Sequence, residues 1–179
     1  MELNLEKFYR ILAPRPVVLV STHDEKGVSN AAPFSFVMPA STEPPLVAFA
    51  SEPSHHTAEN ILKTGDFVVN IPGYGVLEKL RICSEDFPRG VSEIEKANLS
   101  EEKSLKISSP KIKECFAHLE CKLENSYTAG DHLLIVGRVV HADIDDRFFG
   151  DKGYGIALAN PLMHIGGAEF GLLGKIVKA

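Results

Sequence analysis

The chain has few cysteines and no long apolar run, and each shortage excludes a class of protein. Its 179 residues include three cysteines, Cys83, Cys115 and Cys121. An odd number of cysteines in a chain without a secretory signal indicates reduced, buried thiols rather than disulfides. No stretch approaches the roughly 18 apolar residues of a membrane-spanning helix, and the first residues lack the apolar core of a signal peptide. We therefore expect a cytoplasmic protein with no membrane partner.

Clustered positive charge is also missing. The formal net charge is −5 and the pI is about 5.8. Nucleic acid requires a basic surface that displaces counterions, so the sequence predicts no nucleic-acid partner. The charged fraction of 24% and the hydrophobic fraction of 44% are typical of a soluble globular domain. The length suffices for one core, and we expect a single domain over residues 1–179.

The motifs of several common catalytic centres do not occur. There is no G-x-S-x-G nucleophile elbow, and no pair of histidines has the spacing that places two imidazoles on one helix face. The segment G-Y-G-V-L-E from Gly73 to Glu78 lacks the third glycine of a dinucleotide fingerprint and is interpreted as a turn. We predict no metal site, while a metal held by dispersed histidines stays open as an alternative.

Hydrophobic patterning predicts a mainly β chain with inserted helices. Six strands are expected, and the first two of them form a hairpin: residues 15–22, 28–37, 46–50, 67–71, 117–124 and 132–144. A helix is expected over residues 54–64, with Ser54 or Thr57 as its cap and Gly65 as its end. Shorter helices are expected over 75–84 and 92–99. Because helices are only inserted between strands, an antiparallel barrel fits better than alternating βαβ units.

The most informative segment is N-A-A-P-F-S-F, from Asn30 to Phe36. It places Pro33 inside a predicted strand. Proline removes a ladder hydrogen bond and is confined to sheet edges or bulges. The backbone here is therefore expected to leave regular pairing and to be free for a ligand.

Three polar side chains lie at the start of the first predicted helix. Ser54, Thr57 and Asn60 are spaced three residues apart, directly after a strand. Helix N-termini hold phosphate through unpaired N–H groups and a partial positive charge. A phosphate here and a flat ring along residues 31–35 are compatible with one cofactor. Plain helix capping is the alternative.

Two histidines stand near glycine-containing turns. In Gly130-Asp131-His132 the first two residues suffice for the turn, which leaves an imidazole that can hydrogen-bond or stack. His164 lies in P-L-M-H-I-G-G, where the glycines allow the close approach of a ligand or another subunit. On its own, His164 is also explained as a satisfied core histidine.

Taken together, these residues resemble the flavin reductase-like, FMN-binding split-barrel family, and particularly its flavoredoxin-type members from archaea and anaerobes. The match extends from about residue 14 to 167. It rests on the order and spacing of several short marks: Arg15-Pro16, Asn30-Ala31-Ala32-Pro33-Phe34-Ser35, Pro45, Thr57 with Asn60, Phe67-Val68-Val69-Asn70-Ile71, Gly130-Asp131-His132 with Gly137, and His164 with Gly166-Gly167.

The resemblance implies an antiparallel split β-barrel that binds FMN at the interface of a homodimer. The isoalloxazine would contact the backbone of Asn30, Ala31, Ala32, Pro33, Phe34 and Ser35. The phosphate would lie against Ser51, Ser54, Thr57 and Asn60, and His164 would also contact the cofactor. His132 would sit on the flavin face where nicotinamide docks, as the one candidate catalytic residue. Many relatives carry K-D-T where this chain has His55-His56-Thr57, so neutral donors or a protonated histidine would replace the fixed charge.

The implied activity is an FMN-dependent oxidoreductase that moves hydride from NAD(P)H to FMN and passes electrons to free flavin, ferric iron or a redox partner. Such chemistry belongs to the cofactor and needs no dedicated nucleophile from the protein. One alternative is a flavoredoxin-like FMN electron carrier that a partner protein reduces. An alternative of another class is a non-flavin small-barrel binding or metal protein. No residue pattern distinguishes NADH from NADPH.

Overall fold

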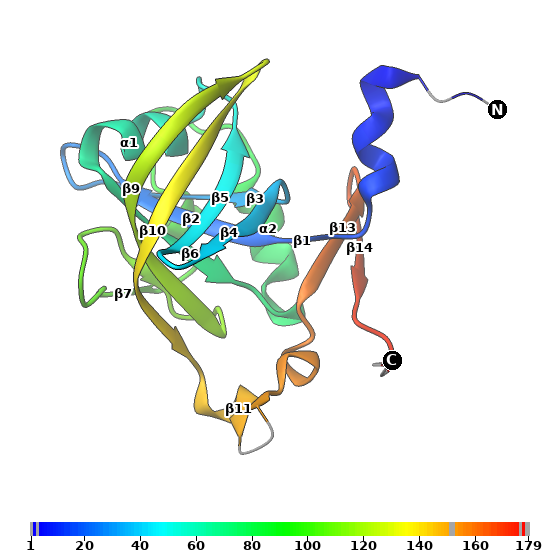
Figure 1. Cartoon of the computed structure of the whole chain (residues 1–179). Helices are drawn as coiled ribbons and strands as arrows, with labels where there is room; N and C mark the ends of the chain where they lie inside the picture. Colours follow the sequence, from blue (N-terminus) through cyan, green and yellow to red (C-terminus); the bar gives the residue numbers. More distant parts are fainter. Residues whose placement is uncertain (1, 3, 151–152, 176, 178–179) are drawn as a thin grey trace.

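The fold is built on one antiparallel sheet that curls into a barrel (Figure 1). The structure is a computed structural model that describes residues 2, 4–150, 153–175 and 177. Seven strands form the sheet, in the order β3 (Ser29–Phe34), β2 (Val18–His23), β6 (Asp66–Ile71), β9 (Ala117–Ala129), β10 (His132–Ile144), β5 (Pro45–Ser51) and β4 (Val37–Thr42). The predicted antiparallel, mainly β architecture is confirmed.

The barrel is split between its two outermost strands. These are β3 and β4, which follow each other in the chain with only Ser35 and Phe36 between them. Across the gap, the Phe34 ring lies 4.9 Å from the Phe49 ring of β5, and Ala50 donates a 2.9 Å hydrogen bond to the Phe36 carbonyl. Pro33 is therefore on an edge strand, where its missing N–H costs no ladder bond.

Two apolar cores lie on the two faces of the sheet. The barrel interior contains Phe34, Phe49 and Phe67 with the β-branched residues of β2 and β6. The outer face of β2 and β3 is covered by α2 (Leu77–Cys83) and α3 (Glu93–Lys96), which contribute Leu80 and Ile94. Packing requires a glycine at position 137 of β10, because a side chain there would collide with the Phe67 ring. The sheet is thus buried on both faces around β2 and β6.

Several predicted elements have other boundaries in the structure. The strand predicted over 28–37 ends at Phe34, and β4 is a separate strand that was not predicted, since Pro39 and its exposed neighbours mask the pattern. The run 15–22 divides into β1 (Arg15–Pro16) and β2, because the Val17 N–H bonds to Leu162 of another sheet. β9 extends to Ala129, so its turn to β10 contains only Gly130 and Asp131.

The helix after β5 is α1 (His56–Thr64), and its capping differs from the prediction. His55 is the N-cap, and no side chain caps the helix, so capping by Ser54 or Thr57 is wrong. The predicted end is confirmed: Gly65 has φ 80° and donates its N–H to the Ile61 carbonyl. The next two helices are shorter than predicted, and a 3-10 turn, η2 (Tyr74–Val76), precedes α2.

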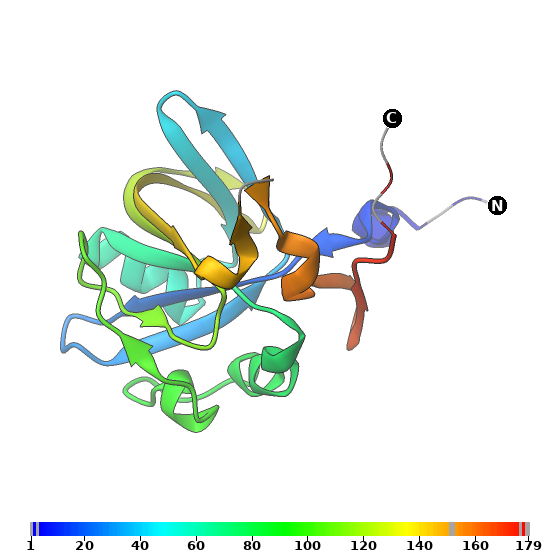
Figure 2. The same ribbon diagram turned by 90° about the horizontal axis from the view of Figure 1, so that it is seen from below.

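A second, smaller sheet joins the two ends of the chain. Its strands are β1, β13 (Leu162–Gly166) and β14 (Glu169–Leu172). A 3-10 helix, η1 (Leu5–Leu12), precedes β1, and Figures 1 and 2 show it standing beside β13 and β14 and away from the barrel. Its apolar side chains are exposed, with Leu5 82% accessible. Among the described helices, none is long and apolar enough to cross a membrane.

The remaining elements are short. Residues 101–112 form a loop closed by β7 (Glu101–Glu102) and β8 (Lys111–Ile112), and we call it the clamped loop. After β10 come η3 (Asp146–Phe148), β11 (Phe149–Gly150), β12 (Gly153–Tyr154) and η4 (Ile156–Ala159). None of these positions a predicted site residue.

Candidate functional site

Three hollows in the surface meet at Pro33 and Phe34, at the end of the edge strand β3. The α2 hollow has a volume of about 400 Å³ and lies between β3, α2 and the β13–β14 hairpin. The α1 hollow, of about 380 Å³, lies toward α1 and α3. The His132 hollow, of about 180 Å³, opens at the split of the barrel. The first two are each large enough for a small-molecule ligand.

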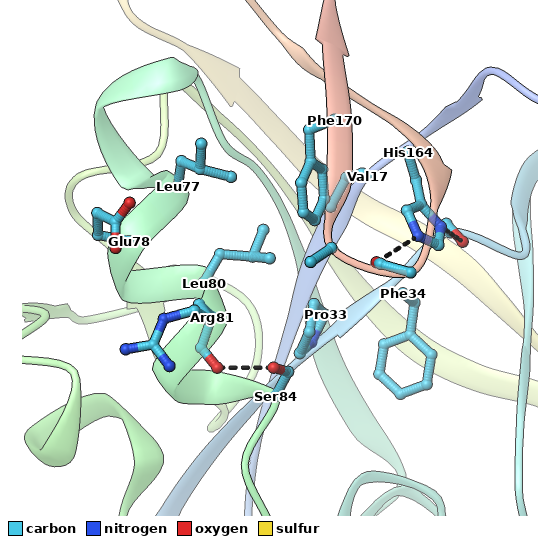
Figure 3. Close-up of a pocket in the computed structure, with 13 residues that line it drawn as sticks. Val17, Pro33, Phe34, Leu77, Glu78, Leu80, Arg81, Ser84, His164 and Phe170 are labelled. Atoms are coloured by element: carbon cyan, nitrogen blue, oxygen red, sulfur yellow. Dashed lines mark hydrogen bonds between the residues drawn. The ribbon is translucent and has the colours of Figure 1, made fainter.

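The α2 hollow has mainly apolar walls (Figure 3). Val17, Leu77, Leu80 and Phe170 surround it, and Pro33 forms its floor toward the other hollows. Its polar groups are at the rim. Such a hollow suits a flat apolar ring with few polar anchors.

His164, at the rim of the α2 hollow, is hydrogen-bonded through both ring nitrogens. Nδ1 lies 3.1 Å from an Arg15 nitrogen and 3.0 Å from Ser35 Oγ, and Nε2 lies 3.1 Å from the Gly167 carbonyl. Because a guanidinium can only donate, Nδ1 is the acceptor and Nε2 carries the proton that it donates to Gly167. His164 therefore ties β13 to β1 and to the end of β3.

Arg15 supplies a buried positive charge behind this rim. It is only 8% exposed. Its guanidinium donates to the Tyr9 carbonyl at 2.7 Å and stacks between the rings of Tyr9 and Phe36. Within the described part of the chain, it forms no ion pair with a carboxylate. The stacking offsets part of the cost of burying this charge, and an anionic ligand nearby would offset more.

A buried chain of polar side chains lies beneath the α1 hollow. Asn60 donates to Thr22 at 3.0 Å, Thr57 donates to the Asn30 carbonyl oxygen at 3.0 Å, and Asn30 donates to Glu93 at 2.8 Å. All five residues are buried. The network holds the start of α1 against β3, and it fixes the backbone of β3 next to the hollow.

The α1 hollow is lined by more acids than bases. Its carboxylates are Glu52, Glu85, Asp86 and Glu93, and among the described residues its only possible cations are His55 and His56. Burial raises the pKa of Glu93, although its own backbone, His56 and Asn30 oppose the shift. Any phosphate in this hollow would therefore depend on hydrogen bonds and on the two imidazoles.

His132 lines the third hollow together with Ser51, where β5 ends and β10 begins. Its ring lies 5.9 Å from the Phe36 ring, and Nδ1 is 2.7 Å from Asp131. The hydrogen bond from His132 lowers the pKa of the Asp131 carboxyl. The imidazole stands at the hollow's edge, where it can stack on or bond to a second ring.

The structure brings most of the predicted site residues to these hollows. Pro33 and Phe34 line all three, and Ser35 lines two. Asn30, Ala32, Ser54 and Thr57 line the α1 hollow. Ala31 is fully buried in the outer core, and Asn60 faces a smaller neighbouring hollow instead. These two residues support the site without lining the main hollows.

Sequence reasoning did not assign roles to several lining residues. Glu93 comes from a helix 63 positions away from Asn30, its partner, so no local pattern could have found it. Leu80, Arg81 and Phe170 reach the α2 hollow from two further elements. Arg15 was marked by the resemblance, but only the fold reveals its burial beside His164.

A second group of possible metal ligands lies outside these hollows. Carboxylate and imidazole atoms of Glu120, His141 and Asp143 lie within 4.8 Å of one another. However, Lys111 Nζ is 3.2 Å from Asp143, and Glu120 accepts hydrogen bonds from two backbone N–H groups of the clamped loop. These groups already satisfy the carboxylates in the structure.

Comparison with known proteins assigns the family. The model of the flavin reductase like domain matches residues 9–170, so the chain belongs to this family. An uncharacterized protein of Methanothermobacter thermautotrophicus is 39% identical over 168 residues, which cover 90% of this chain and 79% of that protein. The predicted family is confirmed.

Solved structures confirm the fold. Nitrilotriacetate monooxygenase component B from Bacillus cereus is 26% identical, with a TM-score of 0.89 over 99% of this chain and 95% of that one. A putative flavin reductase with a split barrel domain from Shewanella frigidimarina has 21% identity and a TM-score of 0.89, over 99% and 93% of the two chains. The split barrel is therefore the fold of this flavin reductase-like protein.

Proposed function

We propose that this protein binds FMN where the three hollows meet and uses it as an NAD(P)H-dependent oxidoreductase. The main observation behind it is the junction at Pro33 and Phe34, where an apolar hollow, a polar hollow and an opening beside the His132 imidazole share one edge strand. Membership in the flavin reductase-like family supports a flavin as the ligand. The donor set fits FMN, because it combines flat apolar walls with hydroxyls and a helix start.

The phosphate end would lie at the start of α1. The N–H groups of its first turn have no intrahelical acceptor, and Ser51 and Ser54 place hydroxyls beside them. The Thr57 hydroxyl already donates its proton to Asn30 Oδ1, so it would act by holding the helix start in place. Asn60 would support the same helix from below.

The ring would lie along the end of β3. As an edge strand, β3 pairs with β2 on one side, so backbone groups on its other side would be open to a ligand, apart from the Ala31 N–H, which Glu93 accepts. These groups can bond the polar edge of an isoalloxazine, while Pro33 and Phe34 contact its face. His164 would fix the rim through Ser35 and Arg15 rather than through a free nitrogen.

When bound, the flavin would supply the hydride chemistry, and the protein would position the two reacting rings. His132, which lines the third hollow, would orient a nicotinamide. Free flavin, ferric iron or a redox partner would then take the electrons.

We further propose that the protein acts as a homodimer with FMN at the interface. The hollows are open to solvent, and the exposed apolar side chains of η1 and β14, such as Phe8 and Leu172, form a surface that a second copy can cover. Association would exclude water from the reacting rings.

Three measurements on the purified protein test this function. Released cofactor should be FMN by chromatography, and the loaded protein should sediment as a dimer. Anaerobic stopped-flow mixing with NADH or NADPH should bleach the flavin absorbance. Tight FMN binding without bleaching would instead support the electron carrier, and a protein that binds no flavin would contradict the proposal.

A further inference from the structure

The α1 hollow presents an electrostatic conflict for the ligand assigned to it, and the inference below rests on the proposed function. A phosphate dianion would face the carboxylates of Glu52, Glu85, Asp86 and Glu93. No lysine or arginine of the described chain lines this hollow. Like charges that face each other in such a hollow repel. Some compensating positive charge must therefore come from the histidines.

His56 is the better placed of the two imidazoles. It is the first residue of α1, its side chain is 26% exposed, and its Nδ1 lies 3.9 Å from Glu93 Oε1. Glu93 is 5% exposed and is held in place by Asn30. His55 repeats the arrangement at the surface: its Nε2 lies 3.9 Å from Glu52, but its side chain is 47% exposed.

Other charged groups around His56 do not remove the conflict. A small hollow on the far side of His56 is lined by Asp24 and Arg89, and Arg89 forms a salt bridge with Glu59. The Cys83 thiol lines the α1 hollow, and burial raises its pKa to about 12, so it stays neutral. His56 thus stands between a buried acid and the place of the phosphate.

We propose that His56, assisted by His55, is a proton-dependent phosphate anchor, so that FMN binds together with a proton and is released as the pH rises. A dianion favours a protonated imidazole beside it and disfavours an ionised Glu93, and both effects take up protons on binding. Histidine is the side chain whose charge changes between pH 5 and 8.

The test compares FMN with riboflavin, which has the same ring but no phosphate. The full chain, freed of bound flavin, is titrated with each ligand at pH 6.5, 7.5 and 8.5 by fluorescence quenching of the flavin. The FMN dissociation constant should rise with pH, by up to tenfold per unit where one proton is taken up. The riboflavin dissociation constant should stay within about twofold. Equal slopes for the two ligands would overturn the proposal.

Variants identify the group that takes up the proton. His56→Gln should remove most of the pH slope and should weaken FMN binding at pH 6.5 to the level found at pH 8.5. His141→Gln, a half-exposed histidine on β10 outside all three main hollows, is the matched control and should keep the full slope. Because the phosphate of FMN itself titrates near pH 6, slopes are read as the difference between wild type and His56→Gln.

Glu93→Gln should have the opposite effect on FMN binding to His56→Gln. Without the buried negative charge, FMN should bind more tightly at pH 8.5 by several-fold, with riboflavin unaffected. An unchanged slope in His56→Gln, or weaker FMN binding in Glu93→Gln at pH 8.5 with a folded protein by circular dichroism, would contradict the anchor. If neither flavin binds to wild type at any pH, the proposed function itself fails.

Discussion

Two buried polar networks lie on opposite sides of the same sheet, and they end differently. Under the clamped loop, Glu120 accepts the N–H groups of Leu105 and Lys106 at 2.8 and 2.7 Å, and Asp66 accepts those of Ser108 and Ser109. At the α1 hollow, the network from Asn60 through Asn30 ends at Glu93, which faces open space and a histidine. The first network ends at backbone N–H groups of the clamped loop, and we call this region the closed side. The second network ends at the α1 hollow, and we call that region the open side.

The difference separates a structural role from a functional one. Buried polar groups must be paired, and the clamped loop contains few apolar side chains, so the side chains of the sheet hold it by their hydrogen bonds. Asn70 also holds the end of the clamped loop to the sheet, since it accepts a hydrogen bond from the Ile112 N–H at 2.8 Å and donates one to the Leu19 carbonyl at 2.9 Å. A network that leaves an acid at a cavity wall instead costs stability and keeps a charge available for a ligand.

The largest expected effect is on the open side. Ala32 lines the α1 hollow beside Pro33, and Ala32→Trp should fill the space of the cofactor. FMN binding should weaken by at least about 100-fold, roughly 2.7 kcal/mol, with the fold retained by circular dichroism. Ala142→Trp, on the exposed face of β10, is the control and should bind normally. A folded Ala32→Trp protein with full flavin occupancy would show that the edge strand serves only the barrel.

The next effect belongs to the closed side. Glu120→Ala leaves the N–H groups of Leu105 and Lys106 without their charged acceptor, and should lower the free energy of unfolding by about 3 kcal/mol in urea titrations. The FMN dissociation constant should not change, because Glu120 lines none of the hollows. Glu101→Ala, exposed on the same loop, should change stability by less than about 0.5 kcal/mol. Lost FMN binding in folded Glu120→Ala would break the separation of the two networks.

The sequence predicted the open side better than the closed one. Gly65 after a helix carries a local backbone rule and was located correctly. Pro33 does lie on a sheet edge, but the expected departure from regular pairing is wrong, because β3 pairs with β2 in register through Phe34. The strand β4 was missed because Pro39 and polar neighbours hide an edge strand that is only half buried. Partners such as Glu93 and Arg15 meet Asn30 and His164 across 63 and 149 positions. Only the fold creates such contacts.

His132 tests the boundary of the open side, since it lines a hollow but takes no part in the buried network. His132→Ala should slow flavin reduction by NAD(P)H by about 10- to 100-fold, in the range of a lost positioning group. FMN affinity should change by less than about threefold. Single-turnover reduction at the wild-type rate, together with loss of activity on EDTA treatment, would support a metal role instead.

The smallest effect is on the pH dependence of stability. It should have opposite directions for Asp143, which pairs with Lys111 of the clamped loop, and for Glu93 on the open side. Burial alone would raise the pKa of Asp143, but hydrogen bonds from His118 and Lys111 outweigh it and lower the pKa. Its contribution is therefore present above the ordinary aspartate pKa of about 3.9 and is lost as the pH falls below it. Glu93 has a raised pKa, so its folded form loses stability as the pH rises above about 4.3.

Two substitutions measure these signs by chemical denaturation between pH 3 and 8. Relative to wild type, Asp143→Asn should lose stability at pH 7 and approach wild type at pH 3. Glu93→Gln should gain relative stability as the pH rises. Two variants with parallel pH profiles would contradict the contrast between the networks.

The central claim is the location of the cofactor, and a crystal structure of the protein grown with FMN tests it most directly. The account predicts electron density for a ring along residues 30–35 and for a phosphate at residues 51–57, with His56 within hydrogen-bond distance of a phosphate oxygen. FMN density at another surface, with the hollows around Pro33 empty, would contradict it.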